Sequence, residues 1–331
     1  MKKVRFGIIG FGAFAERAIM PAIRSAHNAE LVALQKRSLD MAKWKAEEHS
    51  IPFYFDSVEA LASSNEVDAV FIVSANVQHH SETLTAANHK KHVLVEKPMA
   101  INIHQAKEMV DACERAGVKF MVGHMLRFSP LVQRMKEIIQ SGLIGEITFA
   151  QSHFIYDARH SQRSWVLNKE TAGGGPLFDI GIHCLDTMRY ILNDDTVETV
   201  KSVMMPNHAT GNVEKTCVLA LQFSKGVLAT IYSSFESAYR QGFIEFVGTK
   251  GSISAFNFTP SNTETTLEIK FGKDGKIEKI EKENITVPNL YIKEVEHFSD
   301  CILHEIKPIV TNKNSLQNQE ILERAIIDSK K

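Results

Sequence analysis

The first third of the chain alternates short apolar runs with segments of helical periodicity. The apolar runs predict buried strands: VRFGIIG (4–10), ELVALQK (30–36), AVFIVS (69–74), HVLVE (92–96) and KFMVG (119–123). The segments between them predict helices over 39–49, 78–89 and 103–116, the last with Asn102 as N-cap and Gly117 as its stop. Strands that alternate with helices form right-handed βαβ units, so we predict a doubly wound parallel sheet covered on both faces.

After about residue 124 the alternation gives way to a series of strands. A helix over 130–141 leads to a strand in GEITFAQSHF and to a glycine-led helix in TAGGGPLFDIGIHCLD. Five further runs predict strands: TCVLALQF, GVLATIYSSF, GFIEFVG, GSISAF and TLEIKFG. Helical patterns around 290–304 and 315–328 close the chain. We therefore predict an α/β domain over 1–123 and an α+β domain with a largely antiparallel sheet over 124–331.

The run TCVLALQF is apolar on both of its alternating faces. One face can cover the domain's own helices, and the other can be covered by a second subunit or by another part of the same chain. We expect a homodimer or homotetramer that forms through this sheet.

Length and composition agree with a two-domain globular protein. The chain has 331 residues, 44% of them hydrophobic, with a formal net charge of -1, so we expect neither a nucleic-acid nor a membrane partner. The N-terminal MKKVRFGIIGFGAF is interrupted by Arg5 and by glycines and is not expected to be a signal peptide. The four cysteines lack CxxC spacing, which favours reduced thiols and a cytoplasmic location.

The first glycine cluster follows the first strand and predicts a dinucleotide site. The residues are Gly10-x-Gly12-x-x-Ala15. Gly10 permits the tight turn, Gly12 lets the backbone approach a pyrophosphate, and Ala15 allows close packing of the helix on the sheet. Backbone N–H groups at the start of the helix then face the negative charge.

The end of the second strand bears on the choice between NAD and NADP. A carboxylate there binds the ribose 2′-hydroxyl of NAD, but this chain has Gln35, Lys36, Arg37 and Ser38. Two cations and a hydroxyl suit a 2′-phosphate, so we expect NADP(H), with NAD(H) as the alternative. Arg37 is the first candidate for the phosphate contact and Lys36 the second.

The second glycine cluster, Gly173–Gly175, precedes Asp179 and His183. Because Gly10 and Gly12 already supply a phosphate loop, we interpret this cluster as a hinge or as a close approach of backbone to substrate or cofactor. Asp179 and His183 are four residues apart and share one face of a helix, which favours proton transfer. Asp186, three residues further on, is either a partner in this chemistry or an exposed residue.

Several motifs together resemble the Gfo/Idh/MocA oxidoreductases. They are GIIGFGAFA at the N-terminus, HVLVEKPMA with Glu96, Lys97 and Pro98, and GGGPLFDIGIH; SANVQHH, VGHMLRFSP and FVGTKGSI extend the similarity along nearly the whole chain. The resemblance implies a Rossmann domain, a C-terminal domain with a large open sheet used for assembly, and a sugar or polyol substrate.

The resemblance also implies roles for individual residues. Lys97 matches the active-site lysine, and Asp179 and His183 match the D-x-x-x-H segment. The residues expected to contact the cofactor are Gly10, Phe11, Gly12, Ala13, Phe14, Lys36, Arg37, Ser38, Ser74, Asn76, His79, Glu96, Lys97 and Arg127; those expected to contact the substrate are Lys97, Asp179, His183 and Trp165.

Two positions depart from the family pattern. Ala75 stands where proline is frequent, which makes that loop less stiff. Val166 follows Trp165 where arginine is frequent, while Arg163 precedes it.

The chemistry expected of these residues is hydride transfer coupled to proton transfer. Histidine has an ordinary pKa near 6.5, so His183 suits a general acid/base. Lys97 polarises the reacting oxygen, and Asp179 orients substrate and histidine; Lys97 as the proton donor is the alternative. We expect no metal. The competing functions are a dinucleotide-binding regulator without catalysis and a reductase of a non-sugar ketone or imine.

Overall fold

The computed structural model describes residues 2–159, 163–193, 196–206 and 212–331. Its contacts divide the chain into two compact units. Unit 1 comprises Met1–Met125 and Tyr291–Gln319, and unit 2 comprises Leu126–Leu290 and Glu320–Lys331.

This division differs from a single boundary after residue 123, because the chain returns to unit 1 near its end. The returning helix carries Phe298, whose ring lies 6.4 Å from that of Phe6 in the first strand. Both side chains are fully buried, so the helix is part of the core of unit 1.

Unit 1 contains a six-stranded sheet with the order β3-β2-β1-β4-β5-β6, and each pair of neighbouring strands in it is parallel. Its strands are β1 (Val4–Ile9), β2 (Ala29–Gln35), β3 (Phe53–Phe55), β4 (Ala69–Ile72), β5 (His92–Glu96) and β6 (Phe120–Gly123). Every residue of β4 is buried, so both faces of the sheet are covered. The predicted doubly wound parallel sheet is confirmed, and β3 is a strand that the sequence pattern missed.

The helices of unit 1 begin and end at residues whose chemistry favours these positions. They are η1 (Ala15–Ile19), α1 (Met20–Ser25), α2 (Leu39–Glu48), α3 (Val58–Ser63), α4 (Asn76–Asn88), α5 (Ile103–Ala116), α9 (Leu290–Leu303) and the first part of α10 (Asn312–Asp328). Asn102 accepts a hydrogen bond from the Gln105 N–H at 2.9 Å, and Gly117 ends α5 with φ +68°. Both predicted ends of α5 are confirmed.

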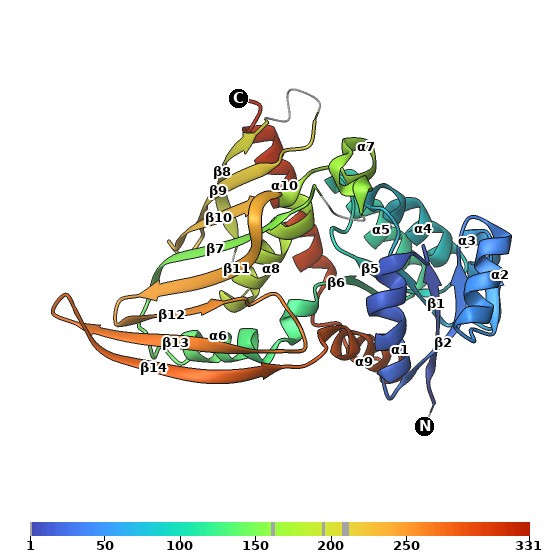
Figure 1. Cartoon of the computed structure of the whole chain (residues 1–331), viewed down its shortest axis with the longest axis horizontal. Coiled ribbons are helices and arrows are strands. Elements are labelled where there is room, and N and C mark those ends of the chain that lie inside the picture. Colours follow the sequence, from blue (N-terminus) through green and yellow to red (C-terminus); the bar gives the residue numbers. More distant parts are fainter. Residues whose placement is uncertain (1, 160–162, 194–195, 207–211) are drawn as a thin grey trace. The chain divides into compact units, whose positions relative to one another are not determined.

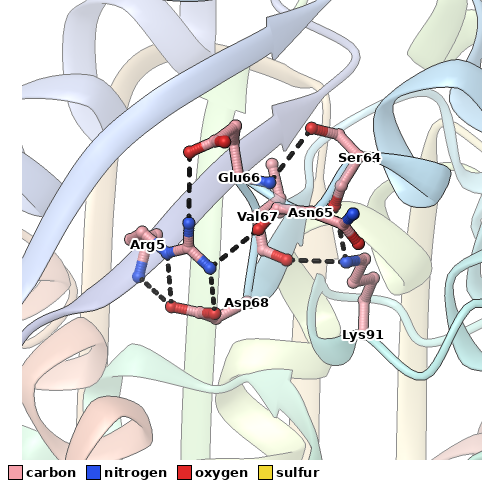
Figure 2. A network of polar contacts seen from close by, with 7 residues as sticks. All are labelled: Arg5, Ser64, Asn65, Glu66, Val67, Asp68 and Lys91. Carbon is pink, nitrogen blue, oxygen red and sulfur yellow. Dashed lines mark hydrogen bonds and ion pairs between the residues drawn. The ribbon is translucent and has the colours of Figure 1, made fainter.

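A polar network joins β1 to the turn before β4 (Figure 2). Arg5 holds the Asp68 carboxylate with Nη2 at 2.8 Å and Nε at 3.1 Å, and its backbone N–H donates to the same group. Lys91 donates to the carbonyls of Ser64 and Val67, both at 2.7 Å. These contacts fix the N-terminal ends of two neighbouring strands, at the edge opposite the predicted cofactor loop.

Unit 2 is built on an eight-stranded sheet with the order β14-β13-β12-β11-β7-β10-β9-β8 (Figure 1). Only β7 and β10 pair in parallel, so the predicted, mostly antiparallel sheet is confirmed. Its strands are β7 (Ile147–Asp157), β8 (Val197–Met205), β9 (Thr216–Phe223), β10 (Leu228–Ser234), β11 (Glu236–Gly248), β12 (Gly251–Phe256), β13 (Thr263–Lys273) and β14 (Lys276–Val287). The sequence pattern missed β8 and β14.

The helical segments of unit 2 include the glycine-led helix that carries the candidate chemistry. They are η2 (Met125–Phe128), α6 (Pro130–Gln140), η3 (Ser164–Leu167), α7 (Lys169–Ala172), η4 (Leu177–Gly181) and α8 (Ile182–Ile191), with the end of α10. η4 packs on β7 and β10, α8 packs on β7, and nearly all residues of both helices are buried. Among the described residues, no helix combines the length and the apolar character needed to cross a membrane.

One face of the large sheet carries a row of apolar and aromatic side chains. Strand register places these residues opposite one another across six strands: Val203, Val218, Tyr232, His153, Phe243 and Phe256. The ring centroids of Phe243 and Phe256 are 4.7 Å apart, and Val203 and Phe256 are 72% and 56% exposed. The alternate residues of β9 (Cys217, Leu219, Leu221 and Phe223) are buried on the other face.

Candidate functional site

The loop after β1 can be formed only by glycine at position 10. Gly10 has φ +80°, and a Cβ added there would lie 2.8 Å from the Cα and N of Ser74. Both the backbone conformation and the close approach exclude a side chain. Gly10 is therefore required by the fold of unit 1 itself.

Gly12 is different, because no atom of the described residues requires it to be glycine. A Cβ added at Gly12 would meet only the Gly10 carbonyl oxygen, at 3.8 Å. Gly12 and Ala13 are exposed at the start of the first helix, while Ala15 is fully buried against the sheet. A bare backbone at a helix N-terminus fits a pyrophosphate. The residues of this loop therefore fit a dinucleotide.

The side chains at the end of β2 fall into two groups. Gln35 accepts from the Gly10 N–H at 3.2 Å and donates to the Asp56 carbonyl at 3.1 Å, and Lys36 donates to the Phe11 carbonyl at 3.2 Å. These two side chains support the loop. Arg37 is exposed, and Ser38 caps α2 by accepting from the Met41 N–H at 3.4 Å. Within the loop, Phe11 packs against His49 and Phe14 against Tyr291.

His79 connects the loop after β4 to the loop after β5. Its Nδ1 lies 3.0 Å from the Pro98 carbonyl and its Nε2 lies 3.2 Å from the Ser74 carbonyl. Complete burial lowers the pKa of His79 to about 4, so the ring is neutral near pH 7 and donates to one of the two carbonyls. The side chain has no exposed surface, which makes it a support for Ser74 and Pro98 and not a surface for a ligand.

Lys97 follows the last residue of β5 at the C-terminal edge of the sheet. Its backbone N–H donates to the carboxylate of Glu96 at 3.1 Å, and its side chain is half-buried. Asn76 is the first residue of α4 and is 5% exposed. In parallel sheets ligands bind at this edge, so the positions of Lys97 and Asn76 suit a role at the cofactor.

Glu294 of α9 lies beside Glu96 in the interior of unit 1. Both carboxylates have an oxygen within 3.6 Å of the point where a Cβ on Gly123 would stand. Glu294 is fully buried, and neither of its oxygens has a hydrogen-bond partner within the described structure. Burial, with the charge of Glu96, raises the pKa of Glu294 well above its ordinary value, so this side chain is a neutral acid.

The glycines of the second cluster approach the chain's own atoms. A Cβ on Gly175 would lie 1.9 Å from the Glu214 carbonyl oxygen, and one on Gly174 would lie 2.5 Å from the Phe178 ring. The Glu214 carboxylate accepts from the N–H groups of Gly175 and Leu177, both at 2.9 Å. A carboxylate of the protein thus occupies this helix N-terminus. The expected approach to substrate or cofactor is corrected to an approach to Glu214.

Asp179 is held by Arg163 and Tyr156. Arg163 donates Nη1 to Oδ1 at 3.0 Å and Nη2 to Oδ2 at 2.9 Å, and the Tyr156 hydroxyl donates to Oδ2 at 2.9 Å. Burial and the carboxylate raise the pKa of Tyr156, so its hydroxyl stays protonated. The attraction of Asp179 raises the pKa of Arg163 further. The arginine absent after Trp165 is thus present two residues before it, on Asp179.

The remaining predicted residues of unit 2 differ in exposure. His183 is the second residue of α8 and is half-buried, with its ring centroid 6.2 Å from that of Phe154, and Trp165 is half-buried on η3. Arg127 has no exposed surface and donates to Asp186, with Nη2 at 2.7 Å and Nε at 2.9 Å. This buried ion pair differs from the cofactor contact expected of Arg127, and it shows that Asp186 is a structural partner and not an exposed residue.

Among the described parts of the chain, one group of side chains has the spacing of metal ligands: Glu16, Glu48 and His49. The Lys45 ammonium lies 2.9 Å from the Glu16 carboxylate and 2.7 Å from that of Glu48. A lysine already neutralises these carboxylates, so the group is an ion-pair cluster that fixes α2 against η1.

Comparison with known proteins identifies the family of this chain from two separate matches. Residues 4–124 match the model of the oxidoreductase family with an NAD-binding Rossmann fold, and residues 132–254 match that of the GFO/IDH/MocA C-terminal domain. The chain belongs to the Gfo/Idh/MocA family of oxidoreductases. The resemblance seen in the sequence is confirmed, and the protein is an enzyme with an NAD-binding Rossmann domain.

Relatives within this family include enzymes with named activities. The chain is 33% identical to 1,5-anhydro-D-fructose reductase of Ensifer adhaerens over 267 residues, 80% of each protein. It is 28% identical to D-xylose 1-dehydrogenase [NADP(+)] of Haloarcula marismortui, over 95% of this chain and 87% of that one. The structure of aldose-aldose oxidoreductase from Caulobacter crescentus superimposes with a TM-score of 0.89 at 25% identity, covering 99% and 98% of the two chains.

Three acidic residues of the site region had no role in the sequence prediction: Glu82, Glu214 and Glu294. All three are buried. Glu214 and Glu294 meet residues that are far away in the sequence, whereas Glu82 lies eight residues from its partner Ser74. The glycines at 174 and 175 were the only sequence signal for Glu214, since they indicate a close approach without naming its partner.

Proposed function

We propose that this enzyme transfers a hydride between NADP(H) and a carbinol or carbonyl carbon of a sugar, inositol or related polyol. The observation that carries the proposal is the C-terminal edge of the unit 1 sheet. There, a bare glycine loop precedes an exposed arginine after β2, and a lysine follows β5. Two relatives named for sugar substrates support the substrate class.

The preference for NADP(H) rests on the absence of a carboxylate at the end of β2 and on the exposed arginine there. It has no carboxylate for a ribose 2′-hydroxyl, and the Gln35 amide is bonded to Gly10 and Asp56. Arg37 is exposed beside Ser38 and suits a 2′-phosphate. The D-xylose dehydrogenase of Haloarcula marismortui, named as NADP(+)-dependent, supports this choice. NAD(H) remains the alternative cofactor, but the end of β2 offers no carboxylate to its ribose 2′-hydroxyl.

Bound NADP(H) would donate or accept the hydride, and the protein would handle the proton of the reacting oxygen. We assign His183 as the general acid/base and Lys97 as the cation that stabilises negative charge on that oxygen. Asp179 binds a substrate hydroxyl while Arg163 and Tyr156 hold its carboxylate in place. Arg127 and His79 keep structural roles in this proposal, and Trp165 contributes to the substrate surface.

We further propose that a second copy of the chain covers the exposed row of the large sheet. The row includes Val218 and Tyr232, and it is continuous over six strands without a charged residue. Apolar faces of this extent are typical of subunit interfaces. Light scattering at several protein concentrations measures the assembly directly, and a monomer throughout would contradict this proposal.

The function is tested by measuring binding of NADPH and NADH together with turnover of aldoses, inositols, keto-sugars and apolar diols or ketones. We expect tighter binding of NADPH and turnover of polyhydroxylated substrates. Tight cofactor binding without turnover would favour the regulator, and turnover of apolar substrates alone would favour the non-sugar reductase.

A further inference from the structure

Glu82 is a buried carboxylic acid that the proposed reaction does not use. It lies on α4 with 8% of its surface exposed, and the Ser74 hydroxyl donates to its Oε2 at 2.5 Å. Ser74 is also the residue whose backbone lies against Gly10. Glu82 is therefore attached to the wall of the predicted dinucleotide loop.

The charged groups around Glu82 come from different elements. From the end of β2, the charge of Arg37 favours the ionised form of Glu82, while the Lys36 ammonium is bonded to the Phe11 carbonyl. On α4 itself, His79 lies one turn earlier and is neutral near pH 7. Burial outweighs the Ser74 hydrogen bond and the Arg37 charge and raises the pKa of Glu82 to about 7.

We propose that Glu82 makes the choice between NADPH and NADH depend on pH, through its hydrogen bond to Ser74 on the loop that faces Gly10 and through its charge interaction with Arg37. The inference rests on the proposed preference for NADP(H). It adds Glu82 of α4 to Arg37 and Ser38, the residues at the end of β2 that suit the 2′-phosphate. The ligand feature that it senses is the 2′-phosphate, the one group that distinguishes the two cofactors.

The physical basis is a linkage between a proton and a phosphate. When Glu82 is protonated, the Arg37 charge is available to a 2′-phosphate. When Glu82 loses its proton, its negative charge competes for Arg37 and repels the phosphate. NADPH must therefore favour the protonated form, and by reciprocity its binding takes up a proton at Glu82. NADH has no 2′-phosphate, so its binding leaves the proton in place.

The experiment measures the dissociation constants of NADPH and NADH between pH 6.5 and 8.5 for the native enzyme and for Glu82→Gln. Glutamine keeps the shape of the side chain and cannot ionise. In the native enzyme we expect the selectivity for NADPH to fall about fivefold relative to its value in Glu82→Gln as the pH rises. The control is Glu66→Gln, an exposed carboxylate at the opposite edge of the sheet, which should follow the native enzyme.

A second measurement needs no variant. Calorimetric titration of the native enzyme with NADPH, in buffers that differ in ionisation enthalpy, should show proton uptake near pH 7 that is absent with NADH. Selectivity with the same pH dependence in native enzyme and Glu82→Gln, or no difference in proton uptake between the cofactors, would overturn the inference and leave the proposed function intact. Equal affinity for both cofactors at every pH would contradict the NADP(H) preference itself and the inference with it.

Discussion

Arg163 and Asp179 form two parallel hydrogen bonds, with Nη1–Oδ1 at 3.0 Å and Nη2–Oδ2 at 2.9 Å. The carboxylate also accepts from Tyr156, and its side chain is 11% exposed. An aspartate bonded in this way is ionised and fixed in orientation. It suits an acceptor for a substrate hydroxyl better than a donor of protons, and this favours His183 or Lys97 as the proton donor.

The first prediction concerns this ion pair. Arg163→Met leaves a largely buried carboxylate without its cation, so we expect the free energy of unfolding to fall by about 1–3 kcal/mol. The double variant with Asp179→Asn should lose less than the sum of the single variants, because the two groups interact. Denaturant unfolding measures this cycle. Arg159→Met, which removes an exposed pair with Asp157, is the control and should change little; strictly additive losses at Arg163 and Asp179 would contradict the coupling.

The second prediction separates the two glycines of the first loop. Gly10→Ala forces a residue with φ +80° against the backbone of Ser74, and we expect a loss of at least about 2 kcal/mol in the free energy of unfolding. The methyl group of Gly12→Ala meets no atom closer than 3.8 Å within the part of the chain that the structure describes, so stability should change by less than about 1 kcal/mol. NADPH binding should nonetheless weaken roughly tenfold or more, because the methyl group lies where the pyrophosphate approaches. Thermal unfolding measures the stability of both variants, and titration with NADPH measures their affinity for the cofactor. An unchanged affinity of Gly12→Ala for NADPH would place the cofactor elsewhere.

The third prediction separates the two cations at the end of β2. Arg37→Gln should weaken NADPH binding about 10- to 100-fold while leaving NADH within about threefold, since a charge-assisted phosphate contact contributes about 1.5–3 kcal/mol. Lys36→Met should weaken both cofactors similarly, because its ammonium supports the Phe11 carbonyl in the loop that both share. Fluorescence titration with the two cofactors measures these constants. A selective loss of NADPH in Lys36→Met but not in Arg37→Gln would reverse the assignment.

The fourth prediction concerns the buried acid Glu294. Its pKa in the folded state is raised above the ordinary value of 4.5, so the native protein binds a proton that the unfolded chain releases. Its contribution to stability is complete below about pH 4.5 and is lost as the pH rises toward the raised value. The free energy of unfolding of Glu294→Gln should therefore depend less on pH than that of the native protein. Between about pH 5 and pH 8, the variant should gain more than about 1 kcal/mol in this free energy relative to the native protein. Urea unfolding at each pH tests this, with exposed Glu47→Gln as the control; parallel curves for native protein and Glu294→Gln would show that Glu294 is ionised when folded.

Local chemistry made much of the fold predictable. Asn102 and Gly117 encode both ends of α5, and the apolar run at 69–72 encodes a strand buried on both faces. The charged alternation of β14 gave no strand signal, because an edge strand of unit 2 keeps lysine and glutamate on its exposed positions. The return of α9 to unit 1 depends on the packing of Phe298 on Phe6, which lies almost the whole chain away.

The site was predictable where a motif fixes a residue and unpredictable where a partner is distant. Gly10, Gly12 and Lys97 follow from their places after strands, and the structure puts all three at the C-terminal edge of one sheet. Glu214 lies 39 residues from Gly175, and Arg163 lies 16 residues from Asp179, so sequence spacing could not pair them. The burial of Arg127 with Asp186 likewise follows from the packing of unit 2 and not from its motif.

We propose that Lys97 and His183 carry out the chemistry on a substrate while the glycine loop holds NADP(H). The most direct test is single-turnover hydride transfer, followed by NADPH absorbance, in the native enzyme, Lys97→Met and His183→Asn, with NADPH binding measured in each. We expect both variants to bind NADPH within about threefold of the native enzyme and to lose at least about 100-fold in the rate of hydride transfer. Native rates of hydride transfer in both variants would contradict these roles of Lys97 and His183.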